Sequence, residues 1–296
     1  MADQVTWDLW RSFLAVARQG SLSGAARVLG ATQPTLGRHI EALESGLGLS
    51  LFTRSQGGLS PTPAALALLA QAEAMEAAAA SLRRSADGAR SEAGGTVRIT
   101  ASEIMGAEVL PDILAGLQEA HPALVVELVL SNRTDDLLRR DADIAVRMVR
   151  PVQEALIAQH LGHVDLGLYA HERYLARHGA PSALSDLPRF HVIGFDRNDH
   201  SARALAKGVI ELDRELFSLR SDSDLAQLAA LRAGLGIGAC QARIAARNPQ
   251  LRPVLAGALA FKLDVWLCMH EDQRASRPVR LAYEALADGL RRWIAG

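Results

Sequence analysis

Apolar side chains recur every three or four positions through the start of the chain, which is the period of an amphipathic helix. In residues 8–19, Leu9, Phe13, Val16 and Ala17 fall on one face, and a glycine follows as it does at many helix ends. Two more helical stretches follow, GAARVLG and TQPTLGRHIEALESGLG, each preceded or begun by a serine or threonine suited to cap it. The pattern therefore predicts three consecutive helices.

The next segment changes period and then becomes helical again. Short extended pieces on either side of Gly57 and Gly58 predict a hairpin, and nothing breaks a helix from Pro63 to about Ser85. Apolar residues in this helix keep a spacing of three and four, typical of a seam between two helices. We expect the seam to pair with a second chain, the alternative being that it docks on its own domain. Its residues are Ala65, Leu68, Ala72, Met75, Ala79 and Leu82.

Beyond this helix the sequence predicts a hinge and then an α/β region. Residues 88–95, GARSEAGG, are small and polar, and afterwards strand-like and helix-like segments alternate, which favours a mostly parallel sheet. About 200 residues of this kind suit two lobes with a cleft between them. We therefore expect domains at 1–62, 63–87 (the linker helix), 88–95 and 96–296. The last should divide into lobe I, about 96–165 and 268–296, and lobe II, about 166–267.

Composition places the chain among ordinary globular proteins. Of 296 residues, 49% are hydrophobic and 22% charged, and no uncharged apolar run or apolar leader predicts a membrane span or a secretory signal. A cytoplasmic location is expected. Cys240 and Cys268 lie in separate apolar stretches and are expected to be buried free thiols. Residues 1–62 hold five arginines and four carboxylates, which gives this part of the chain a net charge of only +1.

The most specific motif runs from Ser23 to Glu44. Two short helices joined by a glycine turn form a helix-turn-helix, and the second helix carries polar side chains at its start, where such helices meet base edges in the major groove. Arginine reads guanine and glutamine reads adenine, whereas a plain amphipathic helix has no reason to gather them there. The expected DNA-contacting residues are Ser23, Thr32, Gln33, Pro34, Thr35, Arg38, His39 and Arg54.

The segment FLAVARQGSLSGAARVLGATQPTLGRHIEALESGLGLSLFTR, continued by GGLSPTPAALALL, closely resembles the DNA-binding domain of LysR-type transcriptional regulators. VRITAS, VLPDILAGLQEAHPALVVEL, DADIAVR and AGLGIGA resemble later landmarks of that family in the same order. The resemblance implies a winged helix-turn-helix, a long linker helix and a two-lobed α/β effector domain similar to periplasmic binding proteins. Gly37 departs from the family's usual serine, and Ala65 from its glycine.

The resemblance implies a ligand between the lobes, and strand ends and helix starts offer candidate contacts. We expect a small effector, carboxylate-bearing, near Ser102, Asn132, Arg147, Phe195 and Asp222. Each has a plainer interpretation. Ser102 and Asp222 would cap helices, Arg147 would pair with a neighbouring acid, and Phe195 would be a core residue. A ligand that also carries an amine would suit Asp222.

Enzyme motifs fail on inspection. HERYL lacks the second histidine of a zinc site, and GLGIG follows a helix and lacks the spacing of a dinucleotide loop. We therefore expect no catalytic residues, cofactor or metal. The favoured function is a regulator that binds operator DNA as a homodimer or homotetramer, with RNA polymerase a further candidate partner. The alternatives are a solute-binding or catalytic α/β protein with an incidental helical domain, and a constitutive architectural DNA binder.

Overall fold

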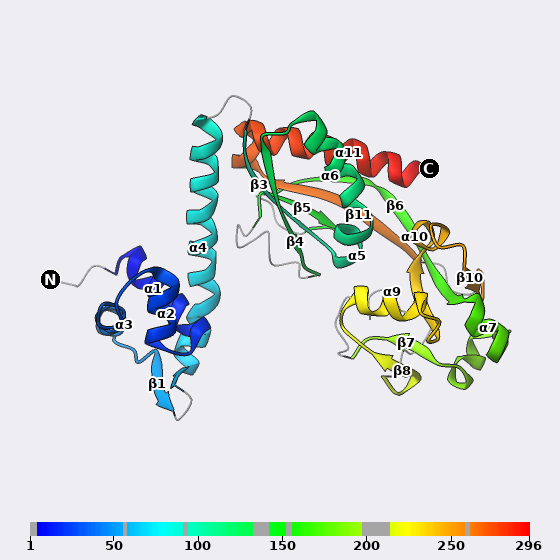
Figure 1. Ribbon diagram of the computed structural model, residues 1–296, viewed down its shortest axis with the longest axis horizontal. Helices are drawn as coiled ribbons and strands as arrows, with labels where there is room; N and C mark the ends of the chain where they lie inside the picture. The colour runs from blue at the N-terminus through cyan, green and yellow to red at the C-terminus, as the bar shows by residue number, and fades with distance from the viewer. Residues whose placement is uncertain are drawn as a thin grey trace. The chain divides into compact units, whose positions relative to one another are not determined.

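The computed structural model describes residues 5–55, 58–90, 94–132, 142–151, 156–196, 214–257 and 261–296. The chain divides into two compact units, with the first extending to Ala86 and the second formed by most of the chain from Asp87 onward (Figure 1). The predicted combination of a helical unit and an α/β unit is confirmed.

The first unit begins with three helices, α1 (Trp7–Gln19), α2 (Leu22–Leu29) and α3 (Gln33–Leu47). The capping predicted for α2 and α3 is confirmed, because Ser21 accepts a hydrogen bond from the Gly24 N–H and Thr32 accepts one from the Thr35 N–H. Glycines end all three helices in the left-handed conformation, with φ of 65°, 65° and 68° at Gly20, Gly30 and Gly48. Glycine adopts this conformation without steric cost.

The predicted hairpin is formed by β1 (Phe52–Ser55) and β2 (Gly58–Pro61), which pair antiparallel. Contacts with Phe13 and Glu44 help to hold it to the helices. The ring of Phe13, fully buried in α1, lies 5.6 Å from that of Phe52 between centroids. The carboxylate of Glu44 accepts hydrogen bonds from the Leu51 and Phe52 N–H groups at 2.6 and 3.2 Å. The wing therefore shares one core with the helices.

Helix α4 (Pro63–Arg90) is capped by Thr62, whose hydroxyl accepts a hydrogen bond from the Ala65 N–H at 3.1 Å. It runs past residue 87, the predicted end, and residues 91–93 of the expected hinge lie outside the described residues. The predicted seam divides along the helix. Ala65 and Ala72 are buried in the unit's own core, so these two are corrected from chain-pairing to intramolecular positions, while Leu68 packs against that core and stays partly exposed.

The later part of the seam differs from the earlier part. Met75 and Leu82 are 42% and 73% exposed. Arg18 of α1 pairs with Glu76 at 2.7 Å, so α1 reaches at least this far along α4. The physical reason is length: α4 extends beyond the three-helix core, so only its first turns have a core to cover.

Pro63–Arg84 is long and apolar enough, by length and composition alone, to be a candidate membrane span, whereas no span was expected from the sequence. A single helix of this kind is weak evidence for a membrane span. Ala65 and Ala72 are buried against helices of the unit's own core. Only 12% of the candidate window is buried, so the helix covers this core with its first turns, and most of its other described positions are exposed or half-buried.

The second unit contains a nine-stranded sheet among its described residues, in the order β4-β3-β5-β11-β6-β9-β7-β8, with β10 on β6. The strands are β3 (Gly95–Ala101), β4 (Leu124–Leu130), β5 (Ile144–Arg147), β6 (Leu156–His171), β7 (Val192–Gly194), β8 (Phe217–Arg220), β9 (Ile237–Gln241), β10 (Leu251–Val254) and β11 (Phe261–His270). Strand β3 is parallel to β4 and β5, and β7 to β8 and β9. The expectation of a mostly parallel sheet is wrong at its centre, because β6 and β11 run antiparallel through both lobes.

The lobes meet where β6 and β11 change register. The pairing shifts between Val265 and Trp266, opposite Gly162, which has a φ of 139°. An irregularity of this kind bends the ribbon. It lies a few residues before each lobe boundary expected from the sequence.

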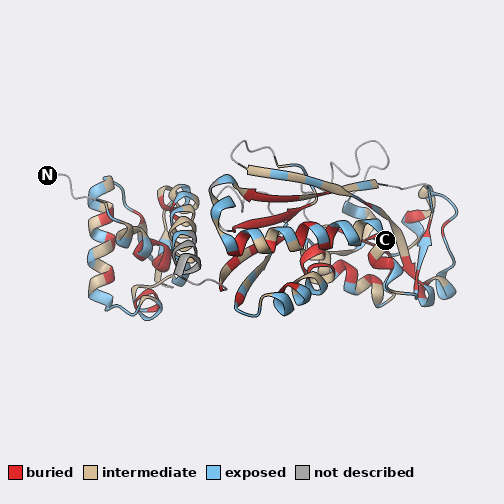
Figure 2. Cartoon of the chain, turned by 90° about the horizontal axis from the view of Figure 1, so that it is seen from above, coloured by how far each residue is buried: buried red, intermediate tan, exposed pale blue. Residues whose placement is uncertain are grey.

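Helices cover the sheet in both lobes, and buried positions line the surfaces between them (Figure 2). Lobe I carries α5 (Glu103–Glu108), α6 (Leu110–Ala120) and α11 (Arg277–Ala295), with one apolar core that includes Ile99, Leu110, Leu267 and Leu286. Lobe II carries α7 (Glu172–His178), α9 (Asp224–Arg232), α10 (Ala242–Ala246) and the short helices Leu184–Arg189 and Arg214–Leu216. A further short helix, Glu271–Ala275, precedes α11.

Candidate DNA interface and ligand site

Helix α3 separates a buried apolar face from a polar start. Leu36, Ile40 and Leu43 are buried in the core of the first unit, while Gln33 and Arg38 are exposed. Gly30 turns the chain between α2 and α3 in a left-handed conformation. This is the geometry of a helix-turn-helix, whose second helix offers its N-terminal side chains to a groove.

The first turn of α3 is organised by threonines. The Thr32 and Thr35 hydroxyls lie 2.8 Å apart, and the Thr35 N–H donates to Thr32. Pro34 is exposed in the first turn, where its missing N–H costs little. A helix start of this kind presents N–H groups and a positive dipole end, which suits a DNA phosphate.

The remaining residues predicted to contact DNA differ in their exposure and in their contacts within the unit. Ser23 and Arg54 are exposed on α2 and β1. His39 is half-buried, with Nδ1 2.7 Å from the hydroxyl of Ser12, which itself donates to the Asp8 carbonyl at 2.8 Å. The Ser12 hydroxyl proton is used in the bond to Asp8, so the Ser12 oxygen accepts a hydrogen bond from His39 Nδ1. His39 Nε2 is then the ring nitrogen left for an outward contact. The sequence predicted a projecting His39, and the structure ties one side of its ring to α1.

In lobe I, three of the predicted effector residues lie at neighbouring strand ends. Ala101 pairs with Leu130 of β4 on one side and Val146 of β5 on the other. Ser102, Asn132 and Arg147 therefore follow or end adjacent strands at the carboxyl edge of the sheet. This edge is where open α/β sheets bind ligands.

Ser102 occupies the N-cap position of α5, but its hydroxyl makes no capping bond. The capping interpretation of Ser102 is therefore wrong. Asn132 takes that place from the next strand, accepting from the Glu103 N–H at 3.0 Å. The Ser102 hydroxyl oxygen is buried and has no hydrogen-bond partner among the described residues. A buried polar atom of this kind is uncommon and calls for a ligand or a water.

Arg147 is only 4% exposed. Its Nη1 donates to the Val146 carbonyl and its Nη2 to the Thr100 hydroxyl, each at 3.1 Å. These bonds fix the guanidinium plane beside β3. A fixed planar donor suits a carboxylate better than a mobile side chain would.

In lobe II, Phe195 and Asp222 also lie at one sheet edge, because Gly194 of β7 pairs with Arg220 of β8. Phe195 is half-buried. Asp222 is exposed and accepts from the Asp196 N–H at 3.0 Å, which holds the turn after β7. The predicted helix cap is instead Ser223, which accepts from the Ala226 N–H. The capping interpretation of Asp222 is therefore wrong.

The two edges touch through Asn132 and through residues that no sequence pattern singles out. The Glu103 carboxylate accepts from the Ser223 hydroxyl at 2.9 Å and from the Leu225 N–H at 3.2 Å, so lobe I supplies an anion to the start of α9. Asn132 Nδ2 donates to Asp224 at 3.0 Å. Burial, with repulsion from Glu103, raises the pKa of the Asp224 carboxyl. Glu103 directly follows Ser102, but no sequence pattern shows that it meets α9.

A second contact between the lobes lies at the other end of α5. Arg232 of α9 donates through Nη1 and Nη2 to both oxygens of Glu108, at 2.7 and 2.6 Å. Arg247, which follows α10, donates to the Glu108 carbonyl at 2.8 Å and pairs with Asp112 at 3.3 Å. The hydrogen bonds from Arg232 lower the pKa of Glu108. Helix α5 is thus anchored to lobe II at both ends.

Comparison with known proteins identifies the domains. Residues 7–66 match the family described as bacterial regulatory helix-turn-helix protein, lysR family, and residues 90–291 match the LysR substrate binding domain. The chain belongs to the LysR family. The resemblance inferred from the sequence is confirmed over both units.

Individual relatives are more distant. A probable hydrogen peroxide-inducible genes activator of Mycobacterium avium is 32% identical over 60% of this chain and 59% of its own length. The probable HTH-type transcriptional regulator LtrA of Klebsiella pneumoniae is 25% identical over 93% of this chain and 92% of its own. The structure of full-length CbnR in complex with its target DNA superposes with a TM-score of 0.65 at 22% identity, covering 97% and 99% of the two chains. This last likeness establishes a shared fold.

Proposed function

We propose that this LysR-family chain is a sequence-specific DNA-binding transcriptional regulator whose activity responds to a small molecule. The observation that carries the DNA-binding part is α3, a capped helix with Gln33 and Arg38 exposed opposite a buried apolar face. A catalytic or solute-binding protein gains nothing from that arrangement. CbnR, which shares this fold, forms a complex with its target DNA. We place the regulator in the cytoplasm, where operator DNA is accessible, and retain RNA polymerase as a candidate partner.

The test of DNA binding uses duplexes selected by the unaltered protein from a random-sequence pool. Arg38→Ala should weaken specific binding by roughly 1–3 kcal/mol if Arg38 reads a base. The matched control is Arg177→Ala, which removes another exposed arginine, from α7 in the second unit. A selected duplex bound equally well by Arg38→Ala and the parent would contradict the assignment, as would no enrichment of any sequence.

We propose that copies of the chain pair through the later part of α4, around Met75, Ala79 and Leu82, to form a dimer or a dimer of dimers. A charge buried between two helices is costly, so Met75→Glu or Leu82→Glu should shift the protein toward monomer in light scattering. Leu66→Glu is the control, because Leu66 is 56% exposed on the same helix but about 180° around it from Met75. An oligomer that survives both seam substitutions would place the interface elsewhere.

We propose that the effector binds at the strand ends of lobe I, with the Ser102 hydroxyl and the Arg147 guanidinium as its contacts and a carboxylate as its anionic group. Two features support this placement. The Ser102 oxygen is buried and unsatisfied among the described residues, and the N-terminus of α9 already receives Glu103. Asn132, Phe195 and Asp222 flank the site, and Asp222 favours an effector that also carries an amine.

A screen of carboxylic and amino acids by thermal shift would identify effectors, followed by the selected-duplex assay. Ser102→Ala and Arg147→Ala should retain DNA binding and lose the response to the effector. Variants that lose DNA binding with and without the effector would indicate a structural role instead.

Thiol oxidation is a second candidate signal, because some relatives are named as probable peroxide-inducible activators. Both cysteines of this chain are buried, and burial raises the pKa of Cys240 to about 11 and of Cys268 to about 12. Reactive thiols require the thiolate and access. We therefore favour a bound effector over an oxidant. A slow reaction of the folded chain with a thiol reagent at neutral pH would support this view, and a rapid one would contradict it.

A further inference from the structure

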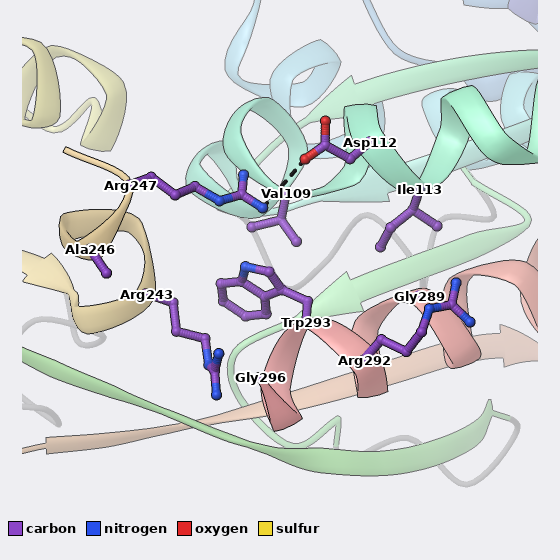
Figure 3. A pocket seen from close by; sticks show the side chains of 10 residues that line it. All are labelled: Val109, Asp112, Ile113, Arg243, Ala246, Arg247, Gly289, Arg292, Trp293 and Gly296. Atoms are coloured by element: carbon purple, nitrogen blue, oxygen red, sulfur yellow. Dashed lines mark ion pairs between the residues drawn. The ribbon is translucent and has the colours of Figure 1, made fainter.

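Two exposed histidines of lobe II, His178 at the end of α7 and His191 just before β7, lie side by side. Their ring centroids are 5.7 Å apart, and the ring planes are inclined at 52°. Arg247 of the same lobe pairs with Asp112 at 3.3 Å (Figure 3), whereas the two imidazoles make no hydrogen bond or ion pair with any residue that the structure describes. Their ring nitrogens are therefore available to a ligand.

Tyr174 holds both histidines in place. Its ring is buried and stacks on that of His178, with the centroids 4.5 Å apart and the planes 25° from parallel. Its hydroxyl accepts a hydrogen bond from the backbone N–H of His191 at 2.8 Å. One buried side chain thus fixes the end of α7 against the residue that precedes β7. Because the two imidazoles are brought together before any ligand arrives, binding costs less conformational entropy.

The separation of the rings matches that of two imidazoles that share one metal ion. Zinc binds an imidazole nitrogen at about 2.0–2.1 Å and prefers tetrahedral geometry, which places the centroids of two ligating rings about 5–6 Å apart. The 5.7 Å between His178 and His191 lies in this range. Stacking on Tyr174 covers a face of the His178 ring, whereas the nitrogen lone pairs that bind a metal lie in the ring plane. The stack therefore leaves the ligating edge of the ring accessible.

We propose that His178 and His191 form a site for a divalent transition-metal ion of the zinc, nickel and copper class. Imidazole suits these ions, whereas magnesium and calcium prefer oxygen ligands. No third histidine, cysteine or carboxylate joins the pair among the residues that the structure describes, so water completes the coordination. No metal was expected from the sequence, because the two histidines belong to no ligand motif and only folding brings them together.

The metal site is separate from the proposed effector site. His191 precedes β7, whereas Phe195, which flanks the effector site, follows the other end of that strand. An ion bound to both histidines ties α7 to the start of β7 and so stabilises lobe II. The inference goes beyond the proposed function and does not depend on it.

The test titrates zinc chloride into the full chain, free of any affinity tag, by calorimetry in a buffer that does not chelate the ion. One zinc ion should bind per chain, and His178→Ala and His191→Ala should each lower its affinity about tenfold, equivalent to about 1.4 kcal/mol. The matched control is His163→Ala, which removes an exposed histidine from β6 and should leave the affinity unchanged. Magnesium chloride should not bind, and circular dichroism checks that each variant is folded.

Copper provides a readout that a merely structural role would not move. With one equivalent of Cu²⁺, the electron paramagnetic resonance spectrum should show coupling to two nitrogens in the parent and to one in either variant of the pair. The same coupling in parent and variants would overturn the proposal, as would zinc affinity that is unchanged in both variants or lost equally in His163→Ala. Binding of magnesium as tight as that of zinc would also overturn it. None of these results alters the selected-duplex assay, so the two proposals fail independently.

Discussion

The DNA-binding unit and the contact between the lobes are held together by opposite kinds of interaction. In the first unit, Phe13, Leu14 and Leu36 are fully buried in one apolar core. Between the lobes, the contacts at the two ends of α5 are polar, with Glu103 at the start of α9 and Glu108 on Arg232. Separating an apolar core exposes surface at a large cost in free energy, whereas separating partly exposed charged groups, which water then solvates, costs less. The difference favours a rigid DNA reader joined to a sensing domain that opens and closes.

The largest effect should follow from removing a ring from the apolar core. Phe13→Ala should lower the free energy of unfolding by about 3–5 kcal/mol, because it leaves a cavity between α1 and the wing. Differential scanning calorimetry of the full chain would show one transition moving down. Val28→Ala, at a 63% exposed position of α2, should change it little. Equal shifts in the two variants would mean that the wing is not part of this core.

Weakening the contact between the lobes should change how readily the lobes open more than it changes the stability of the fold. Glu108→Ala removes both hydrogen bonds to Arg232 and should cost about 1.5–3 kcal/mol. We expect faster hydrogen exchange in α5 and α9 and a larger radius of gyration by X-ray scattering. Glu172→Ala, which breaks the exposed pair with Arg252 inside lobe II, should cost below about 1 kcal/mol and leave both unchanged. Unaltered exchange in Glu108→Ala would refute the role of this pair in closure.

A smaller, stabilising change is expected in the DNA reader. A Cβ at Gly37 would meet only Leu22, at 3.9 Å, so packing does not require glycine there. Gly37→Ala should stabilise α3 by about 1 kcal/mol in the same calorimetry. Gly30→Ala should do the reverse, because Gly30 has a φ of 65°. If Gly37→Ala destabilised the unit, the helix would be constrained by something other than its core.

The smallest effect concerns pH. The pKa of Asp224 is raised from 3.8 by burial and by Glu103, so the folded contact favours the protonated carboxyl. A raised carboxyl pKa destabilises the fold where the group is ionised. The penalty is absent below the unfolded pKa and complete above the folded one. Asp224→Asn, which retains an acceptor for Asn132, should therefore raise the melting temperature at pH 7 relative to the parent, and the difference should vanish near pH 3. A constant difference at both values would exclude this linkage.

Much of the first unit could be predicted because its signals are local. Caps at Ser21 and Thr32 and the glycines that end the helices act within a few residues. The heptad spacing of α4 was equally visible, yet it could not show that Ala65 and Ala72 face the chain's own core while Met75 and Leu82 do not. Periodicity identifies a face of a helix, and only the extent of the neighbouring core decides what covers it.

The proposed ligand site shows the same division. Strand ends placed Ser102, Asn132 and Arg147 correctly along the chain, and the parallel register brought them to one edge. The capping of α5 by Asn132 and the contact of Glu103 with the start of α9 each join segments far apart in sequence. No local sequence pattern encodes such long-range contacts.

The sequence by itself therefore determined the helix-turn-helix, the wing, the linker helix and the alternation of the sensing domain, because periodicity and capping act over a turn or two of chain. The tertiary structure alone decided that the two central strands run antiparallel through both lobes, and that α5 is anchored at both of its ends. The reason is physical: hydrogen bonds and ion pairs between lobes depend on the paths of β6 and β11, and those paths are set by the packing of the whole sheet.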